Sequence, residues 1–250
     1  MCGSFLACLV CSYSIGTTLL EGAHWLMGQP PSSPRPLVQD LKGRQRFGRS
    51  HGDVAGRPFT PPLGSLTMTP QTAVLMSQYS RWMNQRIFEA AAKLTADTLR
   101  ADTGAFFGSI LGTLNHLAVG DTLWLHRFAQ HPHRFEALAG LSEFERPTSL
   151  RQTLSSDLAN LADYRRRLDE LIAQWVAEIR PEHLTVAVAY TSMAGAPFSK
   201  EFGPLLQHFF NHQTHHRGQV TTLLYQSGVD VGVTDLLVLI PESVDQSASL

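Results

Sequence analysis

The chain has 250 residues, of which 43% are hydrophobic and 16% charged, and its formal net charge is −1 at pH 7. This composition is typical of an ordinary soluble globular protein that is long enough to form one good core. A near-neutral chain lacks the basic face that DNA or RNA binding normally requires, so we expect no nucleic-acid partner.

The first 67 residues differ in composition from the rest. From Gln29 to Thr67 the chain is dense in Pro, Gly, Ser and Arg and has no hydrophobic periodicity, so this stretch should not fold alone. We predict that residues 1–67 are either a disordered, low-complexity extension or the product of a mis-assigned start, with Met68 as the true initiator. The folded domain is expected to span residues 68–250.

The extreme N-terminus bears on location and on metal ligands. All three cysteines lie there, at Cys2, Cys8 and Cys11, so the predicted domain can have neither a disulfide nor a cysteine-ligated zinc ion. The apolar run from Phe5 to Leu20 has no basic residue before it, and it is too short and too polar for a confident membrane span. We expect a cytoplasmic protein with no membrane partner.

Beyond Met68 the pattern is mostly helical. Apolar residues recur every three or four positions in four stretches, at about 69–94, 110–128, 149–180 and 203–228. Thr69 and Pro70 form a helix start, Ser149–Gln152 has the form of a capping box, and Pro181 stops the third helix.

A short segment between the third and fourth stretches favours strands. Thr185–Thr191 is rich in β-branched and aromatic residues, and Ala194–Pro197 is turn-like, which predicts a small β-hairpin. We therefore predict an all-α protein, a four-helix bundle with this hairpin between its third and fourth helices. Metal and cofactor sites in such bundles are built from side chains on facing helices.

The fourth helix carries a candidate metal-binding pair, His212 and His216. Their spacing of four residues puts both rings on one helix face, within an apolar stripe that includes Phe209 and Val220. Buried imidazoles at this spacing need an ion, a carboxylate or water as a partner. His208 and His215 fall on the flank of the stripe and are interpreted either as groups behind the metal ligands or as rim groups.

A third ligand is needed to turn this pair into a site. The candidate is His116, at the edge of the apolar stripe of the second helix, where periodicity alone does not decide its direction. Without a metal, the three histidines would form a hydrogen-bonded polar cluster.

Several motifs together resemble those of the DinB family, damage-inducible metal-binding four-helix bundles unrelated to the polymerase of the same name. They cover residues 68–241, and the matching segments are Tyr79–Asn84, Gly108–His116, Asp121, Trp124, Asn211–His212, His215–Gln219, Leu224–Gly228 and Asp235–Leu237. The resemblance implies a three-histidine metal site, and the matching positions here are His116, His212 and His216.

The resemblance also implies a function. Three neutral nitrogens on a divalent ion leave coordination positions open for water or substrate. The ion is expected to be zinc first, with nickel, iron or manganese as alternatives. Relatives include S-transferases and an isomerase that use low-molecular-weight thiols, so we expect a metal-dependent thiol transferase or hydrolase acting on small electrophiles. The alternative is a non-catalytic, metal-stabilised stress-response bundle. A homodimer is a family-level expectation.

Two polar residues have alternative interpretations. Asp121 on the apolar face of the second helix would orient a ligand histidine, or it would form a structural salt bridge to an arginine such as Arg81, Arg127 or Arg217. Gln219 would hydrogen-bond a metal-bound water, or it would bond to another helix.

The remaining aromatic and histidine residues receive structural interpretations. Tyr79, Trp82 and Trp124 would either line a pocket over the metal or, as is more usual at helical spacing, form plain core. Three histidines around Pro132 are expected to be solvated loop residues: His126, His131 and His133.

Overall fold

The computed structural model describes residues 68–242. The predicted N-terminal extension and its three cysteines therefore lie outside the described residues. The predicted start at Met68 is the first residue described. The division into residues 1–67 and 68–250 stays a prediction.

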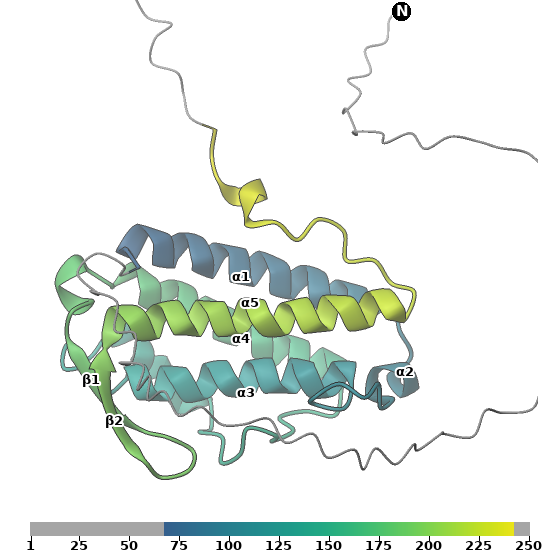
Figure 1. The fold of residues 1–250 in the computed structure, drawn as a ribbon, viewed down its shortest axis with the longest axis horizontal. Coiled ribbons are helices and arrows are strands. Elements are labelled where there is room, and N and C mark those ends of the chain that lie inside the picture. Colours follow the sequence, from purple (N-terminus) through teal and green to yellow (C-terminus); the bar gives the residue numbers. More distant parts are fainter. Residues whose placement is uncertain (1–67, 243–250) are drawn as a thin grey trace, which may run out of the picture. The chain divides into compact units, whose positions relative to one another are not determined.

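Four long helices form a bundle (Figure 1): α1 (Pro70–Ala91), α3 (Ile110–Phe128), α4 (Leu158–Ala177) and α5 (Phe202–Gln226). Helix α1 packs on α4 and α5, and α3 packs on the same two helices, so the four close into a ring around a shared core. This arrangement confirms the predicted four-helix bundle.

Helix ends follow the local sequence signals. The Thr69 hydroxyl accepts a hydrogen bond from the backbone N–H of Thr72 at 3.1 Å, and Pro70 occupies the first turn of α1. Helix α5 ends just before Gly228, whose φ of +82° lies in the left-handed region that glycine adopts without strain. Both ends were predicted.

The predicted start of the third helix at Ser149 is wrong. Helix α4 begins at Leu158, and the Asp157 side chain caps it by accepting from the backbone N–H of Asn160 at 2.9 Å. The reason is a tertiary contact. Asn115 of α3 accepts from the backbone N–H groups of Leu154 and Ser155, at 2.7 and 3.1 Å, and holds this stretch as a loop.

The first helix is also shorter than its apolar stripe. Helix α1 ends at Ala91, so Leu94, predicted to continue the stripe, lies in a turn before the short helix α2 (Ala96–Arg100). Leu94 still packs against the core of this end of the bundle.

The predicted hairpin is confirmed between α4 and α5. Strands β1 (Ala187–Thr191) and β2 (Pro197–Glu201) pair antiparallel, with Ala187 opposite Glu201. Val188 is buried and fastens the hairpin to the core, while every residue of β2 is exposed. Short 3-10 segments complete the chain: η1 (Glu136–Glu143), η2 (Pro181–His183) and η3 (Leu236–Leu239).

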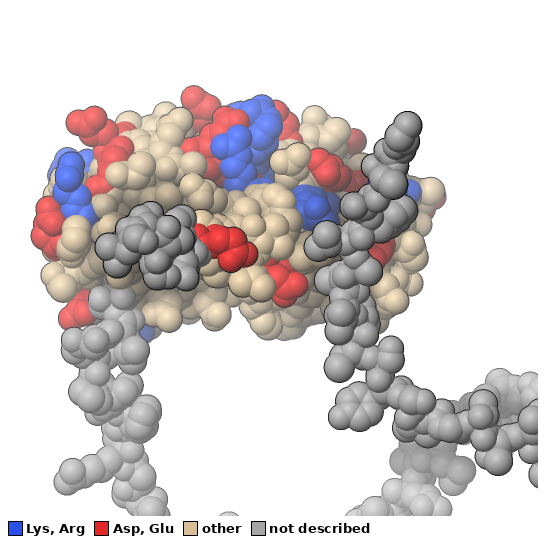
Figure 2. Space-filling model, turned by 90° about the horizontal axis from the view of Figure 1, so that it is seen from above, with Lys and Arg blue, Asp and Glu red and all other residues tan. Residues whose placement is uncertain are grey.

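The core has two hydrophobic clusters. One holds Trp175, Phe128 and Phe202 near the hairpin, and the other holds Met83 and Ile110. No helix within residues 68–242 is long and apolar enough to cross a membrane. On the face shown in Figure 2, basic and acidic side chains are interspersed.

Candidate metal centre

Three histidines meet where α3 packs on α5. Their ligand nitrogens all lie within 4.8 Å of one another. The Nε2 atom of His216 lies 3.2 Å from that of His116 and 3.1 Å from that of His212. His116 and His216 are buried and His212 is half-buried. The structure thus brings together His116, His212 and His216, the three residues that the sequence analysis selected.

The tautomers of two of these rings follow from their partners. The Nδ1 atom of His116 lies 3.0 Å from the carbonyl oxygen of Leu150, which can only accept, so Nδ1 carries the proton. The Nδ1 atom of His216 lies 2.8 Å from the side-chain oxygen of Gln219, which also accepts. In both neutral rings the Nε2 atom therefore presents a lone pair to the cluster.

Burial keeps the cluster uncharged. It lowers the pKa of His116 to about 4 and that of His212 to about 3, and the neighbouring histidines lower both further. Burial also lowers the pKa of His216. At neutral pH no extra proton sits between the rings.

This geometry fits a bound cation. The facing lone pairs of His116 and His216 cannot form a hydrogen bond with each other, and they repel at 3.2 Å unless a positive charge lies between them. Two nitrogens that each lie about 2.1 Å from a tetrahedral zinc ion are about 3.4 Å apart, close to the separations in this cluster. The donor set therefore suits a divalent metal.

A glycine on α3 makes room for the His212 ring. A Cβ atom added at Gly120 would lie 2.9 Å from Cε1 of His212, closer than real Cβ atoms approach other atoms. The close passage of α3 past α5 at this point depends on Gly120. The sequence analysis missed this residue. A glycine within a helical pattern does not reveal which side chain of another helix packs against it.

Within residues 68–242 Gln219 does not make the predicted hydrogen bond to another helix, and its bond to a metal-bound water stays a prediction. Its side chain bonds within α5, with Oε1 accepting from His216 and Nε2 lying 3.2 Å from the exposed His215. Gln219 thereby fixes the orientation of the His216 ring, as the groups behind metal-binding histidines commonly do. His215 is a rim group, as predicted.

The loops beside α3 supply further groups that sequence reasoning did not find. The Phe107 ring stacks on His116 with centroids 3.7 Å apart. The Arg151 guanidinium lies 5.5 Å from the centroid of the same Phe107 ring. Both residues line a small cavity of about 130 Å³ that reaches His116. These contacts depend on loop geometry, which leaves no periodic signal.

Asp121 forms a salt bridge to an arginine, as the second of its two interpretations predicted, although this arginine is none of the three named as examples. Asp121 pairs with Arg165 of α4, which also contacts Asp169 at 2.8 Å, and all three are buried. Asn84 donates to Asp169 at 3.0 Å. This network ties α1, α3 and α4 together, and Asp121 makes no hydrogen bond to a cluster histidine.

The predicted solvation of the histidines near Pro132 is wrong for His131. Only 1% of His131 is exposed, and its Nε2 atom lies 3.2 Å from the carbonyl oxygen of His183 while Nδ1 accepts from the backbone N–H of His133. His126 is half-buried on α3 and bonds the carbonyl oxygen of Phe144 at 3.0 Å. Only His133 is exposed.

The aromatic residues in question belong to the core. Tyr79 is buried and donates to the carbonyl oxygen of Thr234 at 2.7 Å. Trp82 and Trp124 are partly buried against the two hydrophobic clusters. None of the three lines the cavity at His116.

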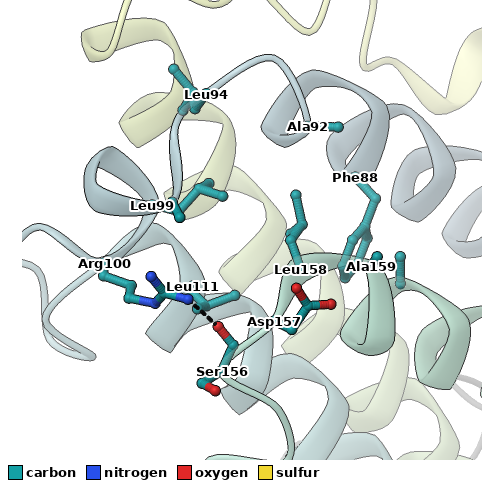
Figure 3. Close-up of a pocket in the computed structure, with 12 residues that line it drawn as sticks. Phe88, Ala92, Leu94, Leu99, Arg100, Leu111, Ser156, Asp157, Leu158 and Ala159 are labelled. Carbon is teal, nitrogen blue, oxygen red and sulfur yellow. Dashed lines mark hydrogen bonds between the residues drawn. The ribbon is translucent and has the colours of Figure 1, made fainter.

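A separate apolar cavity of about 330 Å³ lies near α2 (Figure 3). Phe88, Leu99, Leu111 and Leu158 line it, and Arg100 donates to the carbonyl oxygen of Ser156 at 2.8 Å across its edge. None of the three clustered histidines lines this cavity.

Fold and site together define a class of protein: a four-helix bundle in which three histidines from two facing helices form a cluster suited to a divalent cation. Residues 68–243 match the sequence pattern of the DinB family. The chain belongs to the DinB family.

The chain is also similar to individual proteins. Protein DinB of Bacillus subtilis (strain 168) is 26% identical over 163 residues, which are 65% of this chain and 90% of that protein. A crystal structure of a DinB-like protein from Bacillus cereus ATCC 10987 matches with 21% identity and a TM-score of 0.46, over 65% of this chain and 95% of the other.

Proposed function

We propose that His116, His212 and His216 hold one divalent cation, and that the protein uses it as a metal-dependent thiol S-transferase or hydrolase acting on small electrophiles. The convergence of three neutral Nε2 atoms at 3.1 and 3.2 Å carries the proposal. Zinc is the first candidate, and nickel, iron and manganese also accept imidazole.

A bound divalent ion would supply Lewis-acid chemistry, because the cation lowers the pKa of a thiol or water so that the nucleophile is available near neutral pH. The protein's own groups prepare that chemistry. The carbonyl of Leu150 and the side chain of Gln219 hold two rings in the ligating tautomer. The Phe107 ring covers one face of His116 and excludes water there.

Access to the centre supports a reaction over a purely structural ion. The small cavity reaches His116, and His212 is only half-buried, so the cluster is not sealed by core side chains. The thiol cosubstrate, the homodimer and a stress-response role rest on the family assignment, and the cytoplasmic location rests on the composition of the N-terminal stretch; all four belong to this proposal.

Metal content tests the site. Elemental mass spectrometry of the purified full chain should find about one divalent ion per chain, as a three-histidine site requires. His116→Ala, His212→Ala and His216→Ala should each lose it. His208→Ala is the matched control, since His208 is an exposed histidine one turn before His212 on α5. A protein that stays metal-free after incubation with zinc, nickel, iron and manganese would overturn the proposal.

Turnover separates the catalytic function from the alternative, a metal-stabilised bundle without activity. The stacking of Phe107 on His116 favours that alternative, because it narrows the approach to the centre. Small thiols should react with chlorodinitrobenzene or an epoxide faster with the loaded protein than with the stripped protein or His216→Ala. Loaded protein that melts at a higher temperature but accelerates no such reaction would establish the alternative.

A further inference from the structure

A second polar cavity, of about 410 Å³, lies between the C-terminal end of α3 and the hairpin. Arg127 and His126 line it from α3, Arg146 lines it from the connection to α4, and Tyr190 and Phe198 line it from the two strands. No carboxylate is among the lining residues within 68–242, so the charged groups that this part of the chain brings to the cavity are all basic.

Arg127 is held in place by two aromatic rings. Its guanidinium lies 4.5 Å from the centroid of Trp124 and 5.2 Å from that of Tyr190. Such cation–π contacts fix the plane of the guanidinium and leave its N–H edge available for other partners. Tyr190 of the hairpin and Trp124 of α3 therefore both contact this side chain and restrict its position.

The two arginines of this cavity lack hydrogen-bond acceptors and carboxylate partners in residues 68–242. Neither Arg127 nor Arg146 has a side-chain hydrogen bond or ion pair to that part of the chain, and the Nε atom of Arg127 is buried without an acceptor. Burial, together with the nearby Arg146 cation, lowers the pKa of Arg127. Two like charges kept close without a counter-charge cost free energy that an anion would recover.

We infer that this cavity is a binding site for a small oxyanion, the group shared by phosphates and carboxylates, with Arg127 and Arg146 as its main donors. Guanidinium groups bind such anions through paired, charge-assisted hydrogen bonds. The Nε2 atom of His126 donates to the carbonyl of Phe144, so this ring nitrogen is engaged within the protein. The partly exposed Phe198 ring offers an apolar wall beside the anion.

Calorimetric titration of the full chain with inorganic phosphate, and separately with benzoate, tests the site. Saturable binding of one anion per chain is expected for at least one probe, and the probe that binds distinguishes a phosphate site from a carboxylate site. Arg146→Gln should weaken binding about tenfold or more, since it removes a charge-assisted hydrogen bond. Arg127→Lys keeps the positive charge but loses the planar guanidinium that can donate two parallel hydrogen bonds. It should therefore also weaken binding.

Lys93→Gln is the control, because it removes one positive charge from an exposed position that does not line the cavity. It should bind like the unaltered protein. Arg146 is exposed, so its replacement leaves the fold intact, which thermal melting checks. The site would be ruled out if neither anion bound saturably, or if Arg146→Gln and Arg127→Lys bound as tightly as Lys93→Gln.

Discussion

The Leu150 carbonyl and the Gln219 side chain each hold one imidazole by its Nδ1 atom, and so they decide what the Nε2 atoms can bind. Two Nε2 atoms that both carried protons could not bind a metal ion, whereas two Nε2 lone pairs can bind a cation. The sequence analysis named Gln219 but assigned it other partners, and the Leu150 carbonyl could not be predicted from the sequence. Leu150 lies 34 residues from His116, and its carbonyl reaches the ring only because the loop before α4 folds back over α3.

The space around the histidine rings is as important as the hydrogen bonds that orient them. Gly120→Ala should displace the His212 ring, because the added Cβ would lie 2.9 Å from Cε1 of that ring. We expect a clear loss of bound metal, measured per chain by elemental mass spectrometry after incubation with zinc. Gly218→Ala makes the same change in α5 where a Cβ would meet nothing within 4 Å. It should keep the metal, and equal loss in both variants would contradict this role for Gly120.

At the scale of the elements, a buried ion-pair network joins helices α3 and α4. Arg165 of α4 pairs with Asp121 of α3 and with Asp169, and all three side chains are buried. Removing Arg165 leaves two carboxylates in the core without a counter-charge. Arg165→Ala should therefore lower the free energy of unfolding by about 3–5 kcal/mol, measured by urea denaturation.

Arg166 provides the comparison, since it is the next residue and its ion pairs with Asp163 and Glu170 are exposed. Arg166→Ala should lower the free energy of unfolding far less than Arg165→Ala, because solvent screens an exposed ion pair. Similar costs for the two variants would show that the buried network contributes no more than a surface pair.

Elements were predicted well where local signals and packing agree. Helix α5, with its C-terminal glycine, and the hairpin are where the pattern put them. The start of α4 was not, because the capping-box form of Ser149–Gln152 competes with the side chain of Asn115, which takes the backbone N–H groups of Leu154 and Ser155. A long-range polar contact of this kind has no periodic trace in the sequence.

The cluster also links the stability of the whole molecule to pH. The folded-state pKa of His116, about 4, lies below the ordinary value of 6.5. As pH falls below 6.5 the unfolded chain takes up a proton at this residue and the folded protein does not, so stability present above pH 6.5 is lost down to about pH 4.

Denaturation of metal-stripped protein across this range measures the effect. The free energy of unfolding should fall with pH by at most about 1.4 kcal/mol per pH unit from His116. His116→Gln should show a shallower fall, because the titrating group is gone. A slope unchanged by that substitution would mean that His116 does not titrate as its burial implies.

Asn115 and His116 are neighbours on α3. Their side chains hold the loop before α4 by hydrogen bonds to backbone groups of that loop. The amide protons of Leu154 and Ser155 point at the Asn115 oxygen, so they can exchange with deuterium from solvent only when that loop lifts away. We expect the same movement to draw the Leu150 carbonyl away from His116, because Leu150 lies four residues before Leu154 in that loop. The exchange rate of these two amides therefore reports how often the centre loses the acceptor that keeps His116 in its ligating tautomer.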